Sequence, residues 1–292
     1  MKNYSKLTDT RIQACFNHCI QYLQGQNVED AELTVLYIFE YVFKEKYVVL
    51  LAEDVCVSED KWRVIISYLN RYCQHEPLSY ILGEAFFRSN RYIVRPGVLI
   101  PRPETEELVD YVSQFLKTHF NDKSRLVLYE CGVGSGVISI ELARQFPMLD
   151  IVAWDVSDAA IAVTTENIAL HKVTNIKLQQ GSFFLNIEDF LVDGRDAIIV
   201  SNPPYISESM YGSLTPMVRQ ETYEALVASD DGLTIIKKLM SIAMAYQCPL
   251  ICEIGYDQAE SLLSLYSDLN ISIKQDMNGK DRFLFFTPSK MI

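Results

Sequence analysis

Four residues that could hold a reacting nitrogen follow the apolar run at 197–200: Asn202, Pro203, Pro204 and Tyr205. The lone pair of an amide or aromatic amine nitrogen is delocalised, so this nitrogen attacks only when its N–H groups are held in place. The side-chain oxygen of Asn202 and the backbone carbonyl of Pro203 could accept both N–H groups, because the prolines fix φ around this carbonyl. The ring of Tyr205 would form a flat wall against the substrate. The tetrad therefore predicts a site that turns a planar nitrogen toward an electrophilic carbon.

A glycine-rich turn lies upstream of the tetrad. The apolar run at 126–131, interrupted by Glu130, leads into Gly132, Gly134 and Gly136, and a helical pattern follows. Such a turn lets backbone atoms approach a ligand closely. The glycine spacing differs from that of dinucleotide binders, and an acid at this point would repel a pyrophosphate. S-adenosylmethionine carries an ammonium and a sulfonium but no phosphate, and it is the ligand that suits this turn.

A second acid ends the next apolar segment. Residues 151–154 are Ile, Val, Ala and Trp, and Asp155 follows them. In a doubly wound sheet this is the place of the acid that accepts hydrogen bonds from the ribose hydroxyls of the ligand. We therefore expect Asp155 to hold the ribose.

The same residues also have structural explanations. Asn-Pro commonly begins a turn, so the tetrad could mark only the place where the chain leaves a sheet. Asp155 could be a solvated strand end, or could cap a helix that begins near Ser157. The order of glycine-rich turn, acid and tetrad along the chain favours the chemical explanation for all three.

Length and charge restrict the class of protein. A chain of 292 residues is longer than one core usually serves, which predicts two domains. The formal net charge of −12 disfavours broad capture of duplex nucleic acid, because Lys and Arg supply most of such affinity. We expect no direct contact with nucleic acid.

Cysteine content and hydropathy point to a cytoplasmic protein. Seven cysteines, an odd number, are typical of reduced thiols. Residues 1–10 are polar, with no secretory signal, and no apolar run approaches the ~20 residues that span a bilayer. The short apolar runs lead us to expect no membrane contact. Cys15, His18 and Cys19 have no fourth ligand at suitable spacing, so we expect no metal.

The chain divides into three parts. Up to residue 83, apolar residues recur at helical spacing in three stretches, which predicts a small helical bundle. Residues 84–107 lack this spacing and contain the turn formers Asn90 and Gly97, which predicts a hairpin-like connector. Helical and strand patterns alternate over 108–292. The apolar positions of the helical stretches are Ile12, Phe16, Cys19, Ile20 and Leu23, then Leu33, Leu36, Tyr37 and Phe43 after a predicted cap at Asp30, and last Trp62, Ile65, Ile66 and Leu69.

The strand patterns predict an α/β fold. Helical patterns separate the earlier strands, as in a doubly wound sheet. The last two strands are joined by a short turn at Asn278 and Gly279, which predicts an antiparallel hairpin at the sheet edge. The predicted strands cover 126–131, 150–155, 176–180, 196–201, 249–254, 270–275 and 282–287.

Five segments together match a known family. The most specific is Leu-Ile-Pro-Arg-Pro-Glu-Thr-Glu at 99–106. The others are 76–83, the Asn-Pro-Pro-Tyr-Ile of 202–206, the block of 218–221, 225–226 and 231–233, and Glu-Ile-Gly at 253–255 with Gln258. From about Arg71 to the C-terminus the chain resembles the release-factor glutamine methyltransferases called PrmC or HemK.

The resemblance implies a reaction and a fold. The reaction is methyl transfer from S-adenosylmethionine to the side-chain amide of the glutamine in the Gly-Gly-Gln loop of class I peptide-chain release factors. Asn202 and Pro203 would grip that amide, with Pro204 and Tyr205 beside it, and Asn202 would also touch the cofactor. The implied fold is a Rossmann-like class I methyltransferase sheet (108–292) behind a hairpin and a helical domain (1–83) that docks the release factor. We expect a monomer and a mechanism based on positioning, without a general base of unusual pKa.

The chain departs from the family pattern at three places. The usual Asp of the glycine-rich turn is Glu130, which keeps the charge on a longer side chain. Many relatives have an acid at the adenine amine, whereas this chain has Ser182, with Phe183 still able to cover the adenine ring. The usual Glu-Pro after the tetrad is Glu221-Thr222 here, which changes the expected loop.

Two alternatives remain open for Arg102 and Glu104. They could frame the substrate pocket, and we place both among the substrate-binding candidates. They could also form a clamp that fixes the connector to the catalytic domain, because Pro-Arg-Pro is stiff and a neighbouring Arg and acid often pair.

Three other functions compete with release-factor methylation. A sister enzyme that methylates a ribosomal-protein glutamine shares the tetrad, but its counterpart of residues 101–106 differs. An adenine-amine methyltransferase of nucleic acid uses the same tetrad, but would need a basic groove and base flipping. A non-catalytic module that binds S-adenosylmethionine and only docks a translation factor would retain the turn without turnover.

Overall fold

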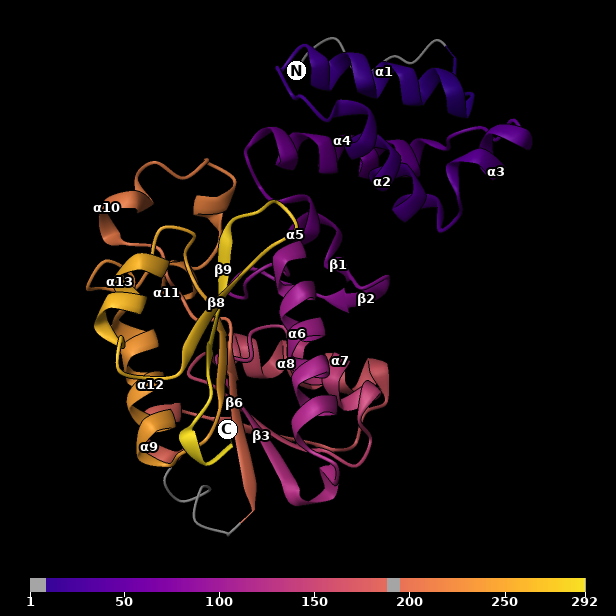
Figure 1. Cartoon of the computed structure of the whole chain (residues 1–292). Helices are drawn as coiled ribbons and strands as arrows, with labels where there is room; N and C mark the ends of the chain where they lie inside the picture. Colours follow the sequence, from indigo (N-terminus) through magenta and orange to yellow (C-terminus); the bar gives the residue numbers. More distant parts are fainter. Residues whose placement is uncertain (1–8, 188–194, 292) are drawn as a thin grey trace. The chain divides into compact units, whose positions relative to one another are not determined.

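The computed structural model describes residues 9–187 and 195–291, which form two compact units (Figure 1). The first unit ends at Gly83 and the second begins at Glu84. Each unit has its own hydrophobic core. In the described part of the chain, no helix is both long and apolar enough to cross a membrane.

The first unit is helical, as the periodicity predicts. Its core consists of side chains from successive helices, among them the fully buried Leu23, Ile38 and Leu69. The hydroxyl of Ser58 caps the longest of these helices by accepting the N–H of Lys61. The helices are α1 (Ile12–Gln24), α2 (Ala31–Phe43), α3 (Tyr47–Ala52), α4 (Glu59–Cys73) and α5 (Leu78–Leu82).

The apolar positions predicted for α2 are confirmed only in part: Leu36 and Phe43 pack against the core, whereas Leu33 and Tyr37 face solvent. Leu33 and Tyr37 are 47% and 45% exposed, whereas Val35 and Ile38 are fully buried. Apolar residues occur on more than one face of this helix, so spacing alone could not choose between faces. Asp30 is the N-cap residue as predicted, but its side chain accepts no capping hydrogen bond.

The second unit begins with the predicted hairpin. Strand β1 (Glu84–Phe87) pairs antiparallel with β2 (Asn90–Ile93). The sequence predicts Asn90 as a turn residue, but the turn consists of Arg88 and Ser89, which both have positive φ. This backbone matches the twist of a two-residue hairpin. The chain enters helix α6 at Pro103, within the range assigned to the connector, and the hairpin belongs to the same compact unit as the sheet.

The described residues of the second unit form a seven-stranded sheet with strand order β5-β4-β3-β6-β7-β9-β8. The first five strands of this order are parallel, and β9 runs antiparallel to β7 and β8. This confirms the doubly wound sheet with an antiparallel hairpin at its edge. The strands are β3 (Leu126–Cys131), β4 (Asp150–Asp155), β5 (Ile176–Gln180), β6 (Asp196–Ser201), β7 (Leu250–Glu253), β8 (Ile271–Gln275) and β9 (Asp281–Phe286).

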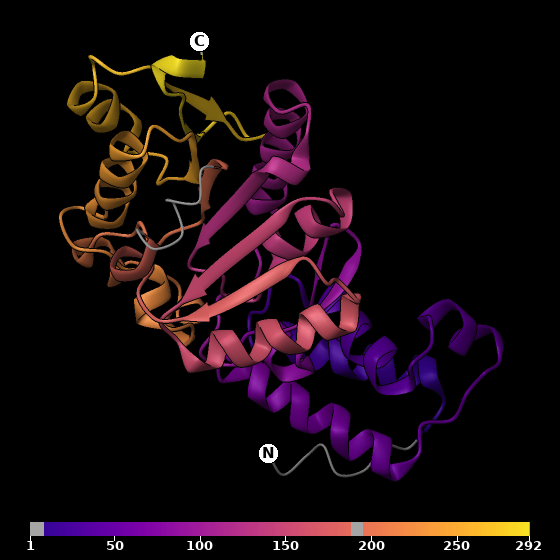
Figure 2. The ribbon, with the colours of Figure 1, turned by 90° about the horizontal axis from the view of Figure 1, so that it is seen from below.

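Helices cover both faces of this sheet, as Figures 1 and 2 show. Successive residues of a strand point to opposite faces, so Leu126 and Leu128 join one core while Val127 and Tyr129 join the other. Helices α6 and α7 contribute to the first core, and α12 and α13 to the second. The remaining bounds are α6 (Pro103–His119), α7 (Val137–Gln145), α8 (Asp158–His171), α9 (Phe183–Asn186), α10 (Glu208–Tyr211), α11 (Tyr223–Leu226), α12 (Thr234–Ala245) and α13 (Ala259–Leu265).

The parallel strands bring the chemically interesting residues to one edge. In the sheet register, Cys131 at the end of β3 lies opposite Trp154 on β4 and Ser201 on β6. The glycine-rich turn, Asp155 and the tetrad therefore begin at neighbouring strand ends. Ligands of open α/β sheets bind at this edge, where the strand order reverses.

Candidate active site

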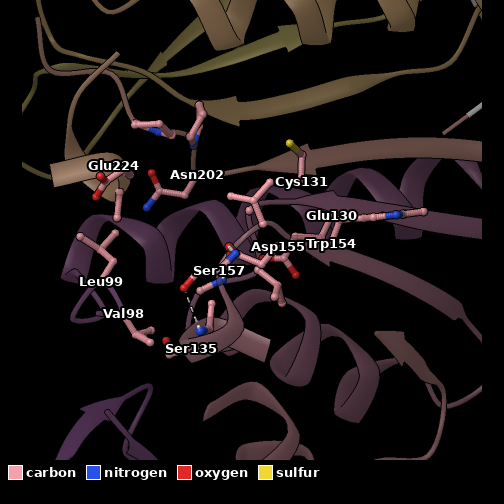
Figure 3. Close-up of a pocket in the computed structure, with 18 of the residues that line it drawn as sticks. Val98, Leu99, Glu130, Cys131, Ser135, Trp154, Asp155, Ser157, Asn202 and Glu224 are labelled. Carbon is pink, nitrogen blue, oxygen red and sulfur yellow. Dashed lines mark hydrogen bonds between the residues drawn. The ribbon is translucent and has the colours of Figure 1, made fainter. Parts of the chain in front are cut away.

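A cavity of about 260 Å³ opens at this edge (Figure 3). Figure 3 shows Asn202 and Glu224 on one side of the cavity and Trp154 on the other. Most residues that the sequence predicts for ligand binding line it. These are Arg102, Glu130, Gly132, Gly134, Asp155, Ser182, Phe183, Asn202, Pro203 and Pro204.

Three predicted residues do not line the cavity: Gly136, Glu104 and Tyr205. Gly136 has φ +84°, and a Cβ atom there would lie 2.8 Å from a methyl group of Thr164. Its lack of a side chain therefore serves the close packing of α7 on α8. The hydroxyl of Tyr205 donates to Glu253, so this ring belongs to the support of the tetrad.

Glu130 lines the cavity and has one buried carboxyl oxygen without a hydrogen-bond partner among the described residues. The side chain is fully buried, and the hydroxyl of Ser139 donates to Oε2. Among the described residues, Oε1 has no hydrogen-bond partner. Burial raises the pKa of Glu130 to about 8, because the charged form loses its hydration. A cationic group in the cavity would satisfy Oε1, so these residues fit the ammonium of S-adenosylmethionine.

Asp155 is tied to the glycine-rich turn. Its Oδ2 accepts the backbone N–H of Gly134 at 2.9 Å, and its Oδ1 accepts that of Ser157 at 2.9 Å. Burial raises the pKa of Asp155. The N-cap of α8 is Ser157, whose hydroxyl accepts the N–H of Ala160, so Asp155 is not the cap of this helix. Each carboxylate oxygen retains a lone pair for a further donor such as a ribose hydroxyl.

Aromatic rings form the wall near the end of β5. The rings of Trp154 and Phe183 meet edge to face, with centroids 5.3 Å apart, and both line the cavity. Phe183 is buried at the start of α9, and Ser182 is the residue before it. A flat ligand such as an adenine ring would find apolar contact here.

A chain of hydrogen bonds holds the side chain of Asn202. Its Nδ2 donates to the hydroxyl of Thr105 at 2.9 Å. That hydroxyl donates to Oε2 of Glu253 at 2.9 Å, and Tyr205 donates to Oε1 at 3.0 Å. The bonds use the amide nitrogen of Asn202, which leaves its oxygen as the acceptor for a group in the cavity.

Gln258 fixes the backbone that follows the tetrad. Its Nε2 donates to the carbonyl oxygens of Tyr205 and Asp231 at 3.0 and 3.1 Å. Its Oε1 accepts the N–H of Gly255 at 2.8 Å. Gly232 has φ +81°, and a Cβ atom there would lie 2.0 Å from the carbonyl oxygen of Tyr205. Three loops therefore meet around one buried amide, and only glycine fits at 232.

Two family models match the chain. The PrmC N-terminal domain matches residues 14–83, and the Methyltransferase small domain matches residues 105–229. The chain is 32% identical to the release factor glutamine methyltransferase of Bacillus subtilis (strain 168) over 267 residues, covering 88% of this chain and 90% of that protein. This chain belongs to the release factor glutamine methyltransferase family.

Further relatives support this membership. The release factor glutamine methyltransferase of Thermodesulfovibrio yellowstonii is 32% identical over 259 residues, covering 86% of this chain and 91% of that protein. A solved structure of the hMettl16 catalytic domain in complex with MAT2A 3′UTR hairpin 6 has a TM-score of 0.52 and 13% identity, covering 79% of this chain and 82% of that one. At this identity the second likeness shows the methyltransferase fold alone.

The family segments of this methyltransferase have visible structural roles. The segment 99–106 supplies Thr105, which donates to Glu253. Glu253 accepts the hydroxyl of Tyr205, and Gln258 donates to the Tyr205 carbonyl oxygen, so both residues support the tetrad. Glu221 is 4% exposed, accepts the N–H of Ile100 at 3.1 Å and pairs with Arg102. The clamp at Arg102 thus exists, but its acid is Glu221 and not the neighbouring Glu104. Arg102 also lines the cavity, so the two alternatives for it are compatible.

Sequence reasoning gave no role to three residues of this site. Thr105 lies 97 positions before Asn202 and is the third residue of α6, inside the helix and not at its N-cap. Glu224 and Thr222 line the cavity from the loop around α11. The only feature of the sequence that pointed to Thr105 was its place in the family segment 99–106, which does not indicate the hydrogen-bond partner of Thr105.

No group of three or more His, Cys, Asp or Glu in the described residues could hold a metal ion. No disulfide links the cysteines, all of which lie in the described residues: Cys15, Cys19, Cys56, Cys73, Cys131, Cys248 and Cys252.

Proposed function

We propose that this methyltransferase transfers the methyl group of S-adenosylmethionine to the side-chain amide nitrogen of a glutamine, namely that of the Gly-Gly-Gln loop of class I peptide-chain release factors. The observation that carries the proposal is one cavity lined both by the amide acceptors Asn202 and Pro203 and by the anionic residues Glu130 and Asp155. The family membership of the chain supports the choice of substrate. A translation factor as substrate implies that the reaction takes place in the cytoplasm.

The residues divide the work between cofactor and substrate. When bound, S-adenosylmethionine supplies an electrophilic methyl carbon on a sulfonium, which is an excellent leaving group. Glu130 would hold the ammonium group, Asp155 the ribose hydroxyls, and Phe183 the adenine ring. Gly132 and Gly134 have positive φ, and no atom lies within 4 Å of where their Cβ would be, so the turn leaves room for a ligand.

The substrate amide would be oriented by two acceptors. The oxygen of Asn202 and the carbonyl oxygen of Pro203 would each take one N–H of the glutamine, so that its lone pair faces the methyl carbon. After attack the nitrogen carries an excess proton, which passes to water. Orientation of this kind contributes on the order of 7–11 kcal/mol in well-aligned reactions. Losing one acceptor should therefore lower kcat more than it weakens ligand binding.

We further propose that the helical unit, residues 1–83, docks the release factor. Its surface exposes apolar side chains, including Leu33, Tyr37 and the 70%-exposed Val48. A protein substrate is large enough to reach beyond the cavity, and exposed aliphatic and aromatic side chains are typical docking contacts. We assign a monomer to the working enzyme.

Mass spectrometry tests the function directly. Purified class I release factor is incubated with the full chain and S-adenosylmethionine, and the mass of the peptide that contains the Gly-Gly-Gln motif is measured. One added methyl group is expected with wild type, and a roughly hundredfold slower reaction with Asn202→Ala. The exposed Asn270→Ala is the matched control and should behave as wild type.

Two outcomes would contradict the proposal. Methylation of a ribosomal-protein glutamine or a nucleic-acid adenine in place of the release factor would reassign the substrate. Cofactor binding by calorimetry without methylation of any of these would indicate a binding module.

A further inference from the structure

The Asn202 amide has two ends of nearly equal size and opposite hydrogen-bonding character. Its oxygen is an acceptor, whereas its NH₂ group only donates. If the side chain turned by 180°, the NH₂ group would face the N–H of a substrate amide, and two donors would oppose each other. The proposed function therefore requires something in the protein that distinguishes the two orientations.

The chain of partners behind Asn202 has a fixed direction. Glu253 is 1% exposed, and its ionised carboxylate has no proton to donate. The Thr105 hydroxyl has a single proton, which it gives to Oε2 of Glu253 at 2.9 Å. The hydroxyl oxygen can then only accept, and it accepts from Nδ2 of Asn202 at 2.9 Å. With Thr105 3% exposed, water does not replace these partners.

We propose that Thr105 and Glu253 are positioning residues that fix the orientation of the Asn202 amide, so that its oxygen faces the reacting nitrogen. The inference deepens the proposed function and rests on it. Glu253 does not line the cavity, and the hydroxyl of Thr105 is taken up by Asn202 and Glu253. Both act through Asn202, and the carboxylate sets the direction of the whole chain.

The remaining contacts of Glu253 keep its carboxylate in place. The Tyr205 hydroxyl donates to Oε1 at 3.0 Å, so both carboxylate oxygens accept hydrogen bonds from hydroxyl groups. The positive charge of Arg282 favours ionised Glu253, while the negative charge of Glu104 opposes it. Arg282 is itself held by Asp276 at 3.3 Å. The buried Cys252 thiol lies beside Glu253 on β7.

Protonation of Glu253 would reverse the donor and acceptor roles in the hydrogen bonds that link Glu253, Thr105 and Asn202. A protonated carboxyl group can donate to Thr105, whose hydroxyl can then donate to the oxygen of Asn202, and the amide is free to turn. Burial is the largest cause that raises the pKa of Glu253, to about 7. Since the ionised form sets the productive orientation, kcat should fall as pH decreases through this range.

Three variants test the proposal, each with kcat, KM for the release factor and cofactor Kd measured separately. Thr105→Val keeps the size but removes the hydroxyl, and kcat should fall about 10- to 100-fold, with KM and Kd within about twofold. Thr105→Ser restores the hydroxyl and should recover most of kcat. Glu253→Gln cannot enforce a direction, so kcat should be low and its fall near pH 7 absent.

A second measurement does not depend on methylation. The side-chain NH₂ protons of Asn202, observed by NMR with ¹⁵N-labelled asparagine, should exchange slowly in wild type and in Thr105→Ser. In Thr105→Val they should exchange at least about tenfold faster. Thermal unfolding of each variant controls for loss of fold.

The outcomes separate the two proposals. If wild type methylates no glutamine but Asn202 exchange responds to Thr105→Val, the proposed function fails and the orienting role stands. Equal kcat in Thr105→Val and wild type, a change confined to KM, or Asn202 exchange unaffected by Thr105→Val would overturn the positioning role.

Discussion

The two sides of the cavity are held in different ways. On the cofactor side, Glu130 and Asp155 lie at the ends of adjacent strands, and their hydrogen-bond partners are residues of the same turn or the next helix. On the substrate side, Asn202 is held by Thr105 from α6 and through it by Glu253 from β7. On the cofactor side, Oε1 of Glu130 has no hydrogen-bond partner among the described residues, whereas on the substrate side the Thr105 hydroxyl and both oxygens of Glu253 are hydrogen-bonded behind the Asn202 amide.

This difference suggests that the two sides tolerate change differently. Burial disfavours the ionised form of Glu130, and a cationic ligand would favour it, so replacement of Glu130 should cost binding and spare the fold. The substrate side has mutually dependent contacts, so one altered residue should disturb several loops. Variants on both sides of the cavity measure this contrast.

The largest effect is expected from Gly232→Ala on the substrate side. The new Cβ would lie 2.0 Å from the carbonyl oxygen of Tyr205, at a residue with φ +81°. We expect the free energy of unfolding to fall by about 3–5 kcal/mol, because backbone must move. On the cofactor side, Gly134→Ala meets no atom within 4 Å and should cost only about 1–2 kcal/mol through its φ of +56°.

Urea unfolding with Gly212→Ala as control measures this contrast. Gly212 has a negative φ and no atom within 4 Å of a built Cβ, so its variant should be close to wild type. Equal losses at Gly232 and Gly134 would contradict the idea that the substrate side is the more constrained one.

The next effect concerns the cofactor. Glu130→Gln removes the charge that faces the cavity, and we expect the Kd for S-adenosylmethionine to rise about 10- to 100-fold. The matched control is Glu141→Gln, a buried carboxylate on α7 that accepts the Tyr92 hydroxyl at 2.6 Å and does not line the cavity. Calorimetric titration should show weaker binding only for the first variant. Unchanged affinity would mean that the ammonium lies elsewhere.

These contacts also explain what the sequence could predict. Glu130 and Asp155 follow recognisable strands, and a parallel sheet places consecutive strand ends together, so their shared site is predictable from local patterns. Thr105 and Asn202 are 97 positions apart, and no local pattern pairs a threonine at a helix start with a strand-end asparagine. The position of Tyr205 in the tetrad predicted that its ring forms a wall against the substrate. In the structure its hydroxyl donates a hydrogen bond to the buried Glu253. Long-range partners of polar groups depend on packing that local patterns do not contain.

Arg102 lines the cavity and also pairs with the buried Glu221. Arg102→Met would leave Glu221, 4% exposed, without its cation, and we expect a loss of about 1–3 kcal/mol in unfolding free energy and a roughly tenfold lower kcat/KM. Adding Glu221→Gln removes the unpaired charge and keeps an acceptor for the N–H of Ile100. The double variant should therefore regain stability, as thermal unfolding can measure. If Arg102 served the substrate alone, the second change would restore nothing.

The remaining effect is the pH dependence of stability in the absence of cofactor. Burial raises the pKa of Glu130 from 4.5 to about 8, so the folded protein binds a proton that the unfolded chain releases within this range. Stability from this group is complete below pH 4.5 and declines as pH rises, until the loss is complete above about 8.

The Glu130→Gln variant isolates this contribution. Gln cannot ionise, so the Tm of the variant should decline less between pH 5 and 8 than that of wild type, and the difference should grow toward pH 8. Glu253, with its pKa raised to about 7, contributes a decline of the same sign that remains in this variant. The exposed Glu29→Gln is the control and should follow wild type. Identical pH profiles for Glu130→Gln and wild type would show that Glu130 is ionised in the empty cavity, and the cofactor side would then hold its charge as firmly as the substrate side does.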